Sequence, residues 1–293
     1  MNQYQLGILA PAPSAARYLT FQAQHQGNIH AALRALQDIV DGERLVVGLG
    51  KALLLQLGIS KPNLANFPSY ATAGVNIPST PADLWCWLRG DERGDLLLQS
   101  QTLIDALAVG FDCVNIIDGF CHQHGRDLTG YEDGTENPVD EAAIAAAIVT
   151  GQGEELDGGS FVAVQQWQHD MSRFKRMSNE QQDYAIGRRR SDNEELEDAP
   201  ESAHVKRTAQ ESFSPEAFVL RRSMSWSEGK NGGLVFVSFG HSVQGFSAQL
   251  RRMVGLEDGI IDGLFQFTRP ITGAYFWCPP IKDGRLVITE NIR

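Results

Sequence analysis

One order of predicted secondary structure, strand-helix-strand-strand-helix-strand, occurs twice along this chain of 293 residues. Alternation of apolar and polar residues indicates strands, and apolar residues at positions 29, 32, 33, 36, 39 and 40 have the spacing of an amphipathic helix. In the first half the elements fall at about 16–23, 28–40, 44–49, 82–88, 95–109 and 113–117. In the second half they fall at about 160–167, 178–187, 217–225, 233–239, 244–254 and 273–278. Two such units predict an α+β protein made of duplicated ferredoxin-like folds, with antiparallel sheets and helices on one face.

A loop at residues 125–138 separates the two halves. Three glycines at positions 125, 130 and 134, followed by Asn137-Pro138, exclude a regular helix or strand there. The flexible Gly130 and Gly134 flank Asp133 and let the backbone approach a flat ligand while one carboxylate faces it. We therefore predict an amino-terminal domain at 1–140 that ends in this loop, and a carboxy-terminal domain at 141–293. A solvated turn is the alternative for the loop.

Composition excludes several classes of protein. A net charge of −11 and a pI near 5.1 argue against a nucleic-acid-binding protein. The four cysteines have no C-x-x-C or disulfide-like spacing, which is typical of free thiols in a reducing compartment. We find no signal peptide and no apolar run of the length that spans a membrane. A cytoplasmic location without membrane or nucleic-acid partners is the expectation.

Three segments together resemble the dye-decolourising (DyP-type) haem peroxidases, in their bacterial B-type or P-type branch. Nine consecutive residues from Gly130 to Pro138 match the family signature G-x-x-D-G continuing into T-E-N-P. Ser202-Ala203-His204 is similar to the family's S-x-H segment. Residues 219–223, Val-Leu-Arg-Arg-Ser, are similar to its strand with the distal arginine. The resemblance extends over nearly the whole chain, and it implies the fold of paired ferredoxin-like domains deduced above.

The resemblance implies one noncovalent haem b per chain, because the sequence has no C-x-x-C-H attachment site. His204 becomes the candidate iron ligand, with His169 as the next candidate. Asp133 becomes the candidate acid–base residue and Arg221 the cation that stabilises charge on the peroxide oxygens.

Further cofactor-binding residues are implied around these three. In an alternating strand Ser223 shares the pocket with Arg221. Asp262, or Asp258 as the alternative, is the candidate second partner of the ligating histidine. Arg188 is a candidate for a haem propionate, and Phe236 is a candidate wall of the pocket, with plain core as its alternative.

The implied function is a haem peroxidase that reduces hydrogen peroxide to water through a ferryl intermediate while oxidising dyes, phenols or other aromatic one-electron donors. The alternatives are a haem-handling protein with incidental peroxidase activity and a haem-free ferredoxin-like module. Some relatives are cargo of encapsulin shells, but the short tail at 283–293 has no long linker, so encapsulation is not expected. We expect a homo-oligomer. The physiological electron donor and any surface aromatic that relays electrons are left open.

Overall fold

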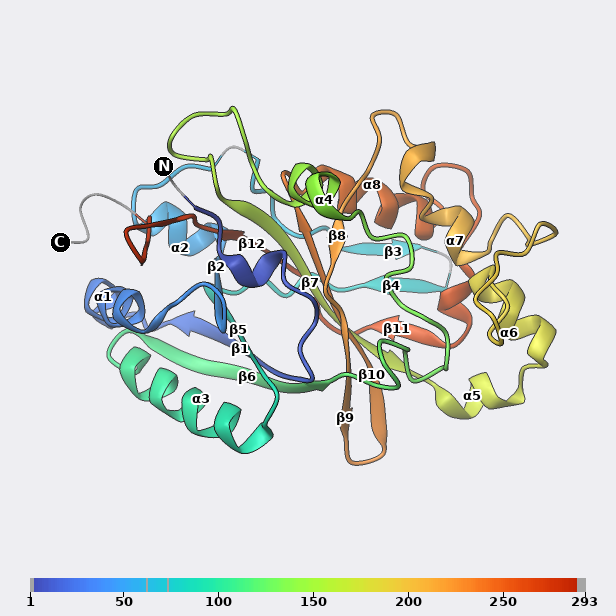
Figure 1. Cartoon of the computed structure of the whole chain (residues 1–293), viewed down its shortest axis with the longest axis horizontal. Helices are drawn as coiled ribbons and strands as arrows, with labels where there is room; N and C mark the ends of the chain where they lie inside the picture. Colours follow the sequence, from blue (N-terminus) through green and yellow to red (C-terminus); the bar gives the residue numbers. More distant parts are fainter. Residues whose placement is uncertain (1–2, 62, 73, 289–293) are drawn as a thin grey trace.

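The computed structural model describes residues 3–61, 63–72 and 74–288 of the chain (Figure 1). Its centre is a ten-stranded sheet in the order β11-β7-β12-β2-β5-β1-β6-β9-β10-β8. The carboxy-terminal tail considered above for encapsulin loading lies partly outside the described residues.

The first half contributes four long strands and the helices that cover them. The strands are β1 (Ala15–Ala23), β2 (Leu45–Leu49), β5 (Leu84–Gly90) and β6 (Phe111–Phe120). Helix α1 (Ile29–Ile39) connects β1 to β2, and α3 (Arg93–Leu107) connects β5 to β6. In space the strands run β2-β5-β1-β6, the order of a ferredoxin-like sheet, and their pairings are antiparallel.

The second half repeats this arrangement. Its strands are β7 (Ser160–His169), β9 (Met224–Glu228), β10 (Asn231–Gly240) and β12 (Ala274–Cys278), which run β12-β7-β10-β9 in space. Helix α6 (Asn179–Ile186) lies between β7 and β9, and α8 (Gln244–Met253) lies between β10 and β12. The expected duplicated ferredoxin-like fold with antiparallel sheets is confirmed. The domain division at residue 140 stays a prediction.

The sheet closes into a barrel, which the sequence did not indicate. Because β7 pairs with both β10 and β12, the two four-stranded units form one ring, joined at β6–β9 and at β2–β12. One cluster of buried residues lies between the outer strand faces and helices α1, α3 and α8, and includes Leu33, Leu103 and Leu250. A second fills the inside of the ring with large aromatic residues, among them Tyr18, Trp85, Trp87, Phe239 and Phe276.

Several short elements were not predicted. They are α2 (Lys51–Gln56), the hairpin β3 (Tyr70–Thr72) and β4 (Val75–Ile77), α5 (Met171–Arg176), α7 (His204–Arg207) and β11 (Thr268–Pro270). Each is too short to produce a periodic pattern. The strand expected at about 217–225 is instead divided into β8 (Leu220–Arg221) and β9. Helix α4 (Asp140–Ala147) follows the 125–138 loop directly.

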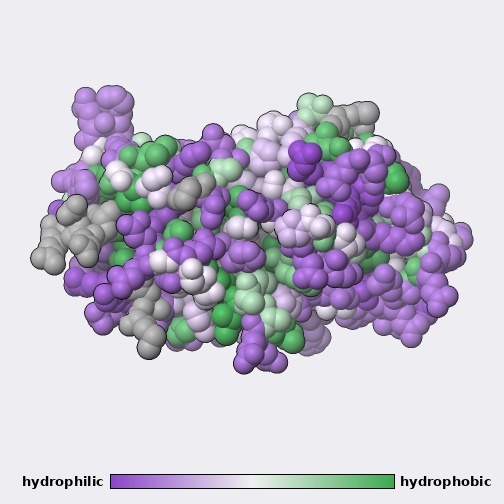
Figure 2. All heavy atoms as spheres, turned by 90° about the horizontal axis from the view of Figure 1, so that it is seen from above, coloured by the Kyte–Doolittle hydropathy of each residue, from purple (hydrophilic) through white to green (hydrophobic). Residues whose placement is uncertain are grey.

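The face of the molecule seen in Figure 2 is largely hydrophilic. Figure 2 shows hydrophobic residues in scattered groups, and the end of the molecule that carries α6 and α7 is covered mostly by hydrophilic ones. No helix within the described residues has the length and hydropathy that crossing a bilayer requires.

Candidate active site

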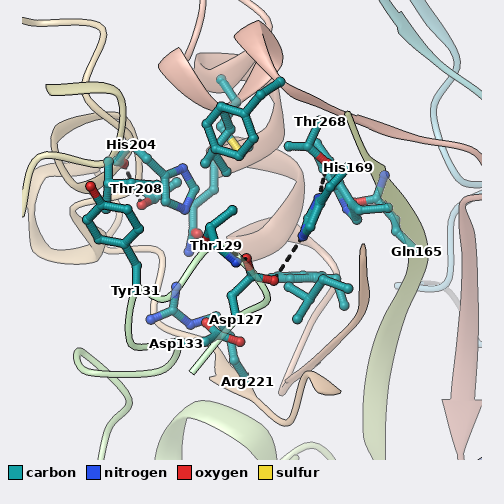
Figure 3. Close-up of a pocket in the computed structure, with 18 of the residues that line it drawn as sticks. Asp127, Thr129, Tyr131, Asp133, Gln165, His169, His204, Thr208, Arg221 and Thr268 are labelled. Carbon is teal, nitrogen blue, oxygen red and sulfur yellow. Dashed lines mark hydrogen bonds and ion pairs between the residues drawn. The ribbon is translucent and has the colours of Figure 1, made fainter. Parts of the chain in front are cut away.

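A cavity lies between the outer face of β7 and β10, helix α8 and the 125–138 loop (Figure 3). Apolar side chains make up much of its wall, namely Trp167, Ile186, Leu234, Phe236, Phe246, Met253, Leu264 and Phe267. The polar lining includes His204, His169, Asp127, Asp133 and Arg221.

The 125–138 loop is shaped by backbone conformations that glycine adopts most easily. Gly130 and Gly134 have φ values of 90° and 80°, so the chain turns sharply on both sides of Asp133. Contacts within the loop stabilise its shape: Asp127 N donates to Tyr131 O at 2.8 Å, and Arg126 pairs with Glu132 at 2.7 Å. A solvated turn is therefore not what the sequence encodes here; the loop has a fixed shape.

Asn137 joins this loop to the strand that carries Arg221. The amide of Asn137 donates to Arg221 O at 3.0 Å, and Arg221 N donates to Asn137 Oδ1 at 2.8 Å. These two bonds satisfy both backbone groups of Arg221 and fix its position relative to the loop. Asp133 and Arg221 are thus carried by segments 84 or more residues apart that are bonded to each other.

Asp133 and Arg221 line the cavity, and no ion pair with another described residue neutralises either charge. Among the described residues, no ion pair or side-chain hydrogen bond holds the Asp133 carboxylate or the Arg221 guanidinium. Both side chains are half-buried. A carboxylate and a guanidinium facing one cavity provide a proton acceptor and a fixed positive charge for a small polar reactant.

His204 approaches the cavity from another side (Figure 3). It is the first residue of α7, and its Nδ1 lies 2.8 Å from Asp262 Oδ2. The Asp262 side chain is fully buried, and its other oxygen accepts a hydrogen bond from Leu264 N at 2.8 Å. Because Asp262 accepts a hydrogen from Nδ1, Nε2 is left with a free lone pair, which is the arrangement found for metal-bound histidines.

Asp258, the alternative partner, has a different contact. Its carboxylate pairs with the buried Arg207 at 2.6 Å, one turn of α7 beyond His204. The hydrogen bond from Arg207 holds the pKa of Asp258 below its usual range. The structure thus brings Asp262, and not Asp258, to His204.

His169, the alternative ligand, has both ring nitrogens occupied. Nε2 lies 2.9 Å from Asp127 Oδ1, and Nδ1 lies 2.7 Å from Thr268 Oγ1. Burial raises the pKa of Asp127, but hydrogen bonds from His169 and Thr129 outweigh it and leave that pKa below its usual value. His169 therefore has no nitrogen left for a metal unless these bonds break.

Arg188 lies outside the set of residues that line the cavity. Its buried guanidinium is paired with Glu136 at 2.5 Å and with Glu195 at 3.2 Å. Two carboxylates already neutralise it, so the position does not support the expected contact with a propionate. In this arrangement Arg188 anchors the end of the 125–138 loop.

Ser223 also differs from expectation, whereas Phe236 lines the cavity as expected. The Ser223 hydroxyl is buried away from the cavity and has no hydrogen-bond partner among the described residues. The reason is that β8 ends at Arg221 and β9 begins at Met224, so strand alternation does not continue through Ser223. Arg222 does point away from the cavity, donating to Leu9 O at 2.6 Å.

Sequence reasoning assigned no role at the site to three residues that shape it: Asn137, Asp127 and Gln165. Asn137 was noted only as a residue before proline. The alternation Gln165, Trp167, His169, which begins on the strand predicted at 160–167 and continues two residues beyond it, contained a signal, because all three line the cavity. The Gln165 amide nitrogen is buried and has no partner among the described residues.

Comparison with known proteins agrees with this geometry. The family described as "Dyp-type peroxidase, C-terminal" matches residues 124–283, which is more than half of the chain. The chain belongs to the Dyp-type peroxidase family. The expected family and enzyme class, a peroxidase, are thereby confirmed.

Individual relatives of this Dyp-type peroxidase match most of its length. A dye-decolorizing peroxidase of Mycolicibacterium paratuberculosis is 27% identical over 94% of this chain and 83% of its own length. One from Brevibacterium linens is 30% identical over 73% of this chain and 61% of its own.

Solved structures show the same fold. A putative Dyp-type peroxidase from Shewanella oneidensis superposes with a TM-score of 0.89 at 29% identity, with 96% of this chain and 97% of the other covered. A DypB variant from Rhodococcus jostii RHA1 in complex with heme has a TM-score of 0.85 at 27% identity, covering 94% and 95%.

Proposed function

We propose that this Dyp-type peroxidase binds one haem b noncovalently in the cavity and uses it to reduce hydrogen peroxide with electrons from aromatic donors. The observation that carries the proposal is the pairing of His204 with the fully buried Asp262 on one side of an apolar cavity, with the uncompensated Asp133 and Arg221 elsewhere in its wall. The Rhodococcus jostii relative with bound heme supports the choice of cofactor.

The residues present fit a haem. A porphyrin is flat and mostly apolar, and the cavity is lined by Phe236, Phe246 and Phe267 together with aliphatic side chains. His204 offers Nε2 as the iron ligand, since Asp262 fixes the tautomer. The unpartnered amide nitrogen of Gln165 is a further donor for a polar group of the cofactor or an ordered water.

The haem, when bound, supplies the redox chemistry that no amino-acid side chain of the cavity provides. The Asp133 carboxylate takes the proton that hydrogen peroxide loses on binding, and returns it to the oxygen that leaves as water. The Arg221 guanidinium remains charged and stabilises the negative charge that develops on the peroxide oxygens. Asn137 keeps these two side chains in register through the Arg221 backbone.

The haem-handling alternative is not favoured. A carrier has no need of a carboxylate and a guanidinium kept unpaired in a cavity, because such groups lower stability without aiding binding of an apolar ligand. A homo-oligomer, a cytoplasmic location and absence from encapsulin shells stay predictions, as does the identity of the physiological donor.

The experiment that tests the proposal is a haem titration of purified apoprotein, followed by the Soret band, in the wild type, His204→Ala and His169→Ala. We expect a stoichiometric complex with the wild type, retained binding with His169→Ala, and weak binding with a changed spectrum for His204→Ala. Addition of hydrogen peroxide and a phenolic donor to the wild-type complex then tests turnover. Unchanged binding and spectrum in His204→Ala would move the iron ligand to another residue.

A further inference from the structure

Two arginine side chains at one end of the ring have no carboxylate partner. Arg89 is on β5, and strand alternation places it on the same face as Trp85 and Trp87, which face the inside of the ring. Arg222 follows β8 directly. Only 9% of Arg89 is exposed, and Arg222 is half-buried. In the part of the chain that the structure describes, both guanidiniums donate to backbone oxygens and neither joins an ion pair.

The amino-terminal segment holds both guanidiniums. Arg89 Nη2 donates to Pro11 O at 2.6 Å, and Arg222 Nη2 donates to Leu9 O at 2.6 Å. Ile8 is fully buried in the cluster inside the ring, and Leu9 packs against that cluster. Since two residues of chain span at most about 7 Å, these carbonyls hold the two guanidiniums at the same end of the ring.

The two positive charges act on each other. Burial, and after it the charge of Arg89, lower the pKa of Arg222 to about 10. Burial also lowers the pKa of Arg89, while the exposed Glu43 and Asp41 act in the opposite direction without forming an ion pair with it. Both guanidiniums stay charged at neutral pH. Because a buried charge is costly unless an opposite charge and hydrogen bonds compensate for it, an anion between the two would stabilise the fold.

Two uncharged donors lie next to the arginines. Tyr18 and Trp87 stack with their ring centroids 6.1 Å apart, and the Arg89 guanidinium lies 4.8 Å from the centroid of Trp87. Burial raises the pKa of Tyr18, so the phenol keeps its hydrogen. Trp87 Nε1 is close enough to the phenol oxygen to affect this pKa, but the two atoms do not reach hydrogen-bond geometry.

Four buried donor atoms in this region therefore have no acceptor among the described residues. They are the Tyr18 hydroxyl, Trp87 Nε1, Arg89 Nε and Arg222 Nε. Buried donors in folded proteins are almost always satisfied. The group points to an acceptor that the polypeptide itself does not supply.

The strand register brings these donors together. Ala16 of β1 pairs with Arg89 on one side and with Gly119 of β6 on the other, so the three share the inner face of the ring. A Cβ at Gly119 would lie 3.6 Å from the Tyr18 hydroxyl and 3.5 Å from Met224 Cβ. The hydroxyl is thus beside the start of β9, close in sequence to the second arginine. Alanine and glycine carry little or no side chain, which leaves room on the inner face beside Arg89.

We propose that this end of the ring binds one small monovalent inorganic anion, of the size of chloride, between Arg89 and Arg222. The anion offsets one of the two charges and accepts hydrogen bonds from the four unpartnered donors. An anion with a bulky substituent does not fit, because Tyr18 and Trp87 are almost fully buried. The site is separate from the cavity, which lies on the outer face of the sheet, and it does not depend on haem.

Anion binding would also support the active site from behind. Arg222 Nη1 donates to Arg221 O at 3.1 Å, and the same oxygen accepts a hydrogen bond from Asn137. By holding Arg222, the anion joins the amino-terminal segment to the backbone that carries the Arg221 guanidinium.

The test measures stability against chloride concentration. The full-length protein, with and without haem, is unfolded with urea while sodium gluconate replaces sodium chloride at constant ionic strength. For one site, each tenfold rise in chloride above its dissociation constant should lower the unfolding equilibrium constant tenfold. We expect the same dependence in both forms. A dependence only in the haem-loaded form would place the anion at the haem and overturn the proposal.

Three variants locate the site. Arg222→Met should abolish the chloride dependence. Tyr18→Phe removes one oxygen atom and should weaken chloride binding by ~10–100-fold, the effect of one hydrogen bond to a charged group. Arg17→Met is the matched control, because Arg17 is also on β1 but faces the other side of the sheet and pairs with Asp118 at 3.4 Å. Its chloride dependence should equal that of the wild type.

Crystals grown with bromide in place of chloride give a direct view. We expect an anomalous peak in contact with both guanidiniums. Bromide only at the surface, an adventitious ion only, would overturn the site, as would wild-type stability that does not change with chloride. An equal chloride dependence in Tyr18→Phe and the wild type would do the same, and this variant decides the matter if Arg222→Met does not fold.

Discussion

Replacing Asp262 with asparagine tests how the buried carboxylate acts on His204. The substitution keeps size and an acceptor oxygen for Leu264 N, but it removes the negative charge 2.8 Å from His204 Nδ1. A hydrogen bond to an ionised acceptor is about twice as strong as a neutral one. Because the Asp262 side chain is fully buried, water does not screen this difference.

The expected loss of haem affinity can be estimated from this contact. Loss of an outer-shell partner of a metal-bound histidine typically weakens metal binding by ~10–100-fold, or about 1.4–2.7 kcal/mol. We expect Asp262→Asn to weaken haem binding within this range and to raise the reduction potential of the iron, because the imidazole donates less charge. Haem titration gives the affinity, and spectroelectrochemistry gives the potential.

Asp258→Asn is the matched control. Asp258 lies in the same loop but pairs with Arg207, so its variant should keep wild-type haem affinity and potential. Equal affinity and potential in Asp262→Asn and the wild type would refute the reasoning. The same changes in both variants would show that loop stability, and not the charge at His204, is responsible.

Three other predictions concern the remainder of the site. Arg221→Leu should slow the stopped-flow reaction with hydrogen peroxide by ~10²–10³-fold with haem binding intact, and Asp133→Asn should slow it as well; a wild-type rate in Arg221→Leu would contradict its role. Asn137→Ala removes two hydrogen bonds to Arg221 and should lower the free energy of unfolding by about 1–3 kcal/mol, measured by urea denaturation, and also slow the peroxide reaction. Asp127, whose pKa is lowered in the folded state, contributes stability that is present above its unfolded pKa of about 3.9 and is lost as the pH falls through the folded value. Asp127→Asn should therefore be less stable than the wild type at pH 7, and the difference should shrink below about pH 4; a difference independent of pH would contradict this.

The sequence predicted helices and strands well where their apolar pattern extends over many residues. Helix α1 and strands β1, β7 and β10 have clear apolar patterns, and they lie within a few residues of their predicted positions. The closure of the ring was not predictable, because it depends on which strand edges meet, and edge pairing leaves no local pattern.

Within the site, sequence similarity predicted that His204, Asp133 and Arg221 share one cavity, and the structure places all three in its wall. The expectation for Ser223 differed from the structure, because strand alternation assumed a continuous strand, whereas the strand ends two residues earlier. The hydrogen bond from the Tyr131 hydroxyl to Asp183 could not be predicted, because it joins residues 52 positions apart through a loop whose shape the glycines permit but do not specify. Arg188 pairs with Glu136 of the 125–138 loop and with Glu195 of its own segment, contacts that leave no local pattern in the sequence. Its contact with a haem propionate stays a prediction.

The way in which the ring closes bears on how such a chain arose. In each half the last strand pairs with the second strand of the other half: β6 with β9, and β12 with β2. The two junctions are thus related by an approximate twofold rotation. A single ancestral half would expose these same two edges, and two identical copies would complete the ring as a symmetric dimer. In this chain the two halves differ in what they carry: the Asp133 loop follows β6, whereas His204 and Arg221 lie between β7 and β9.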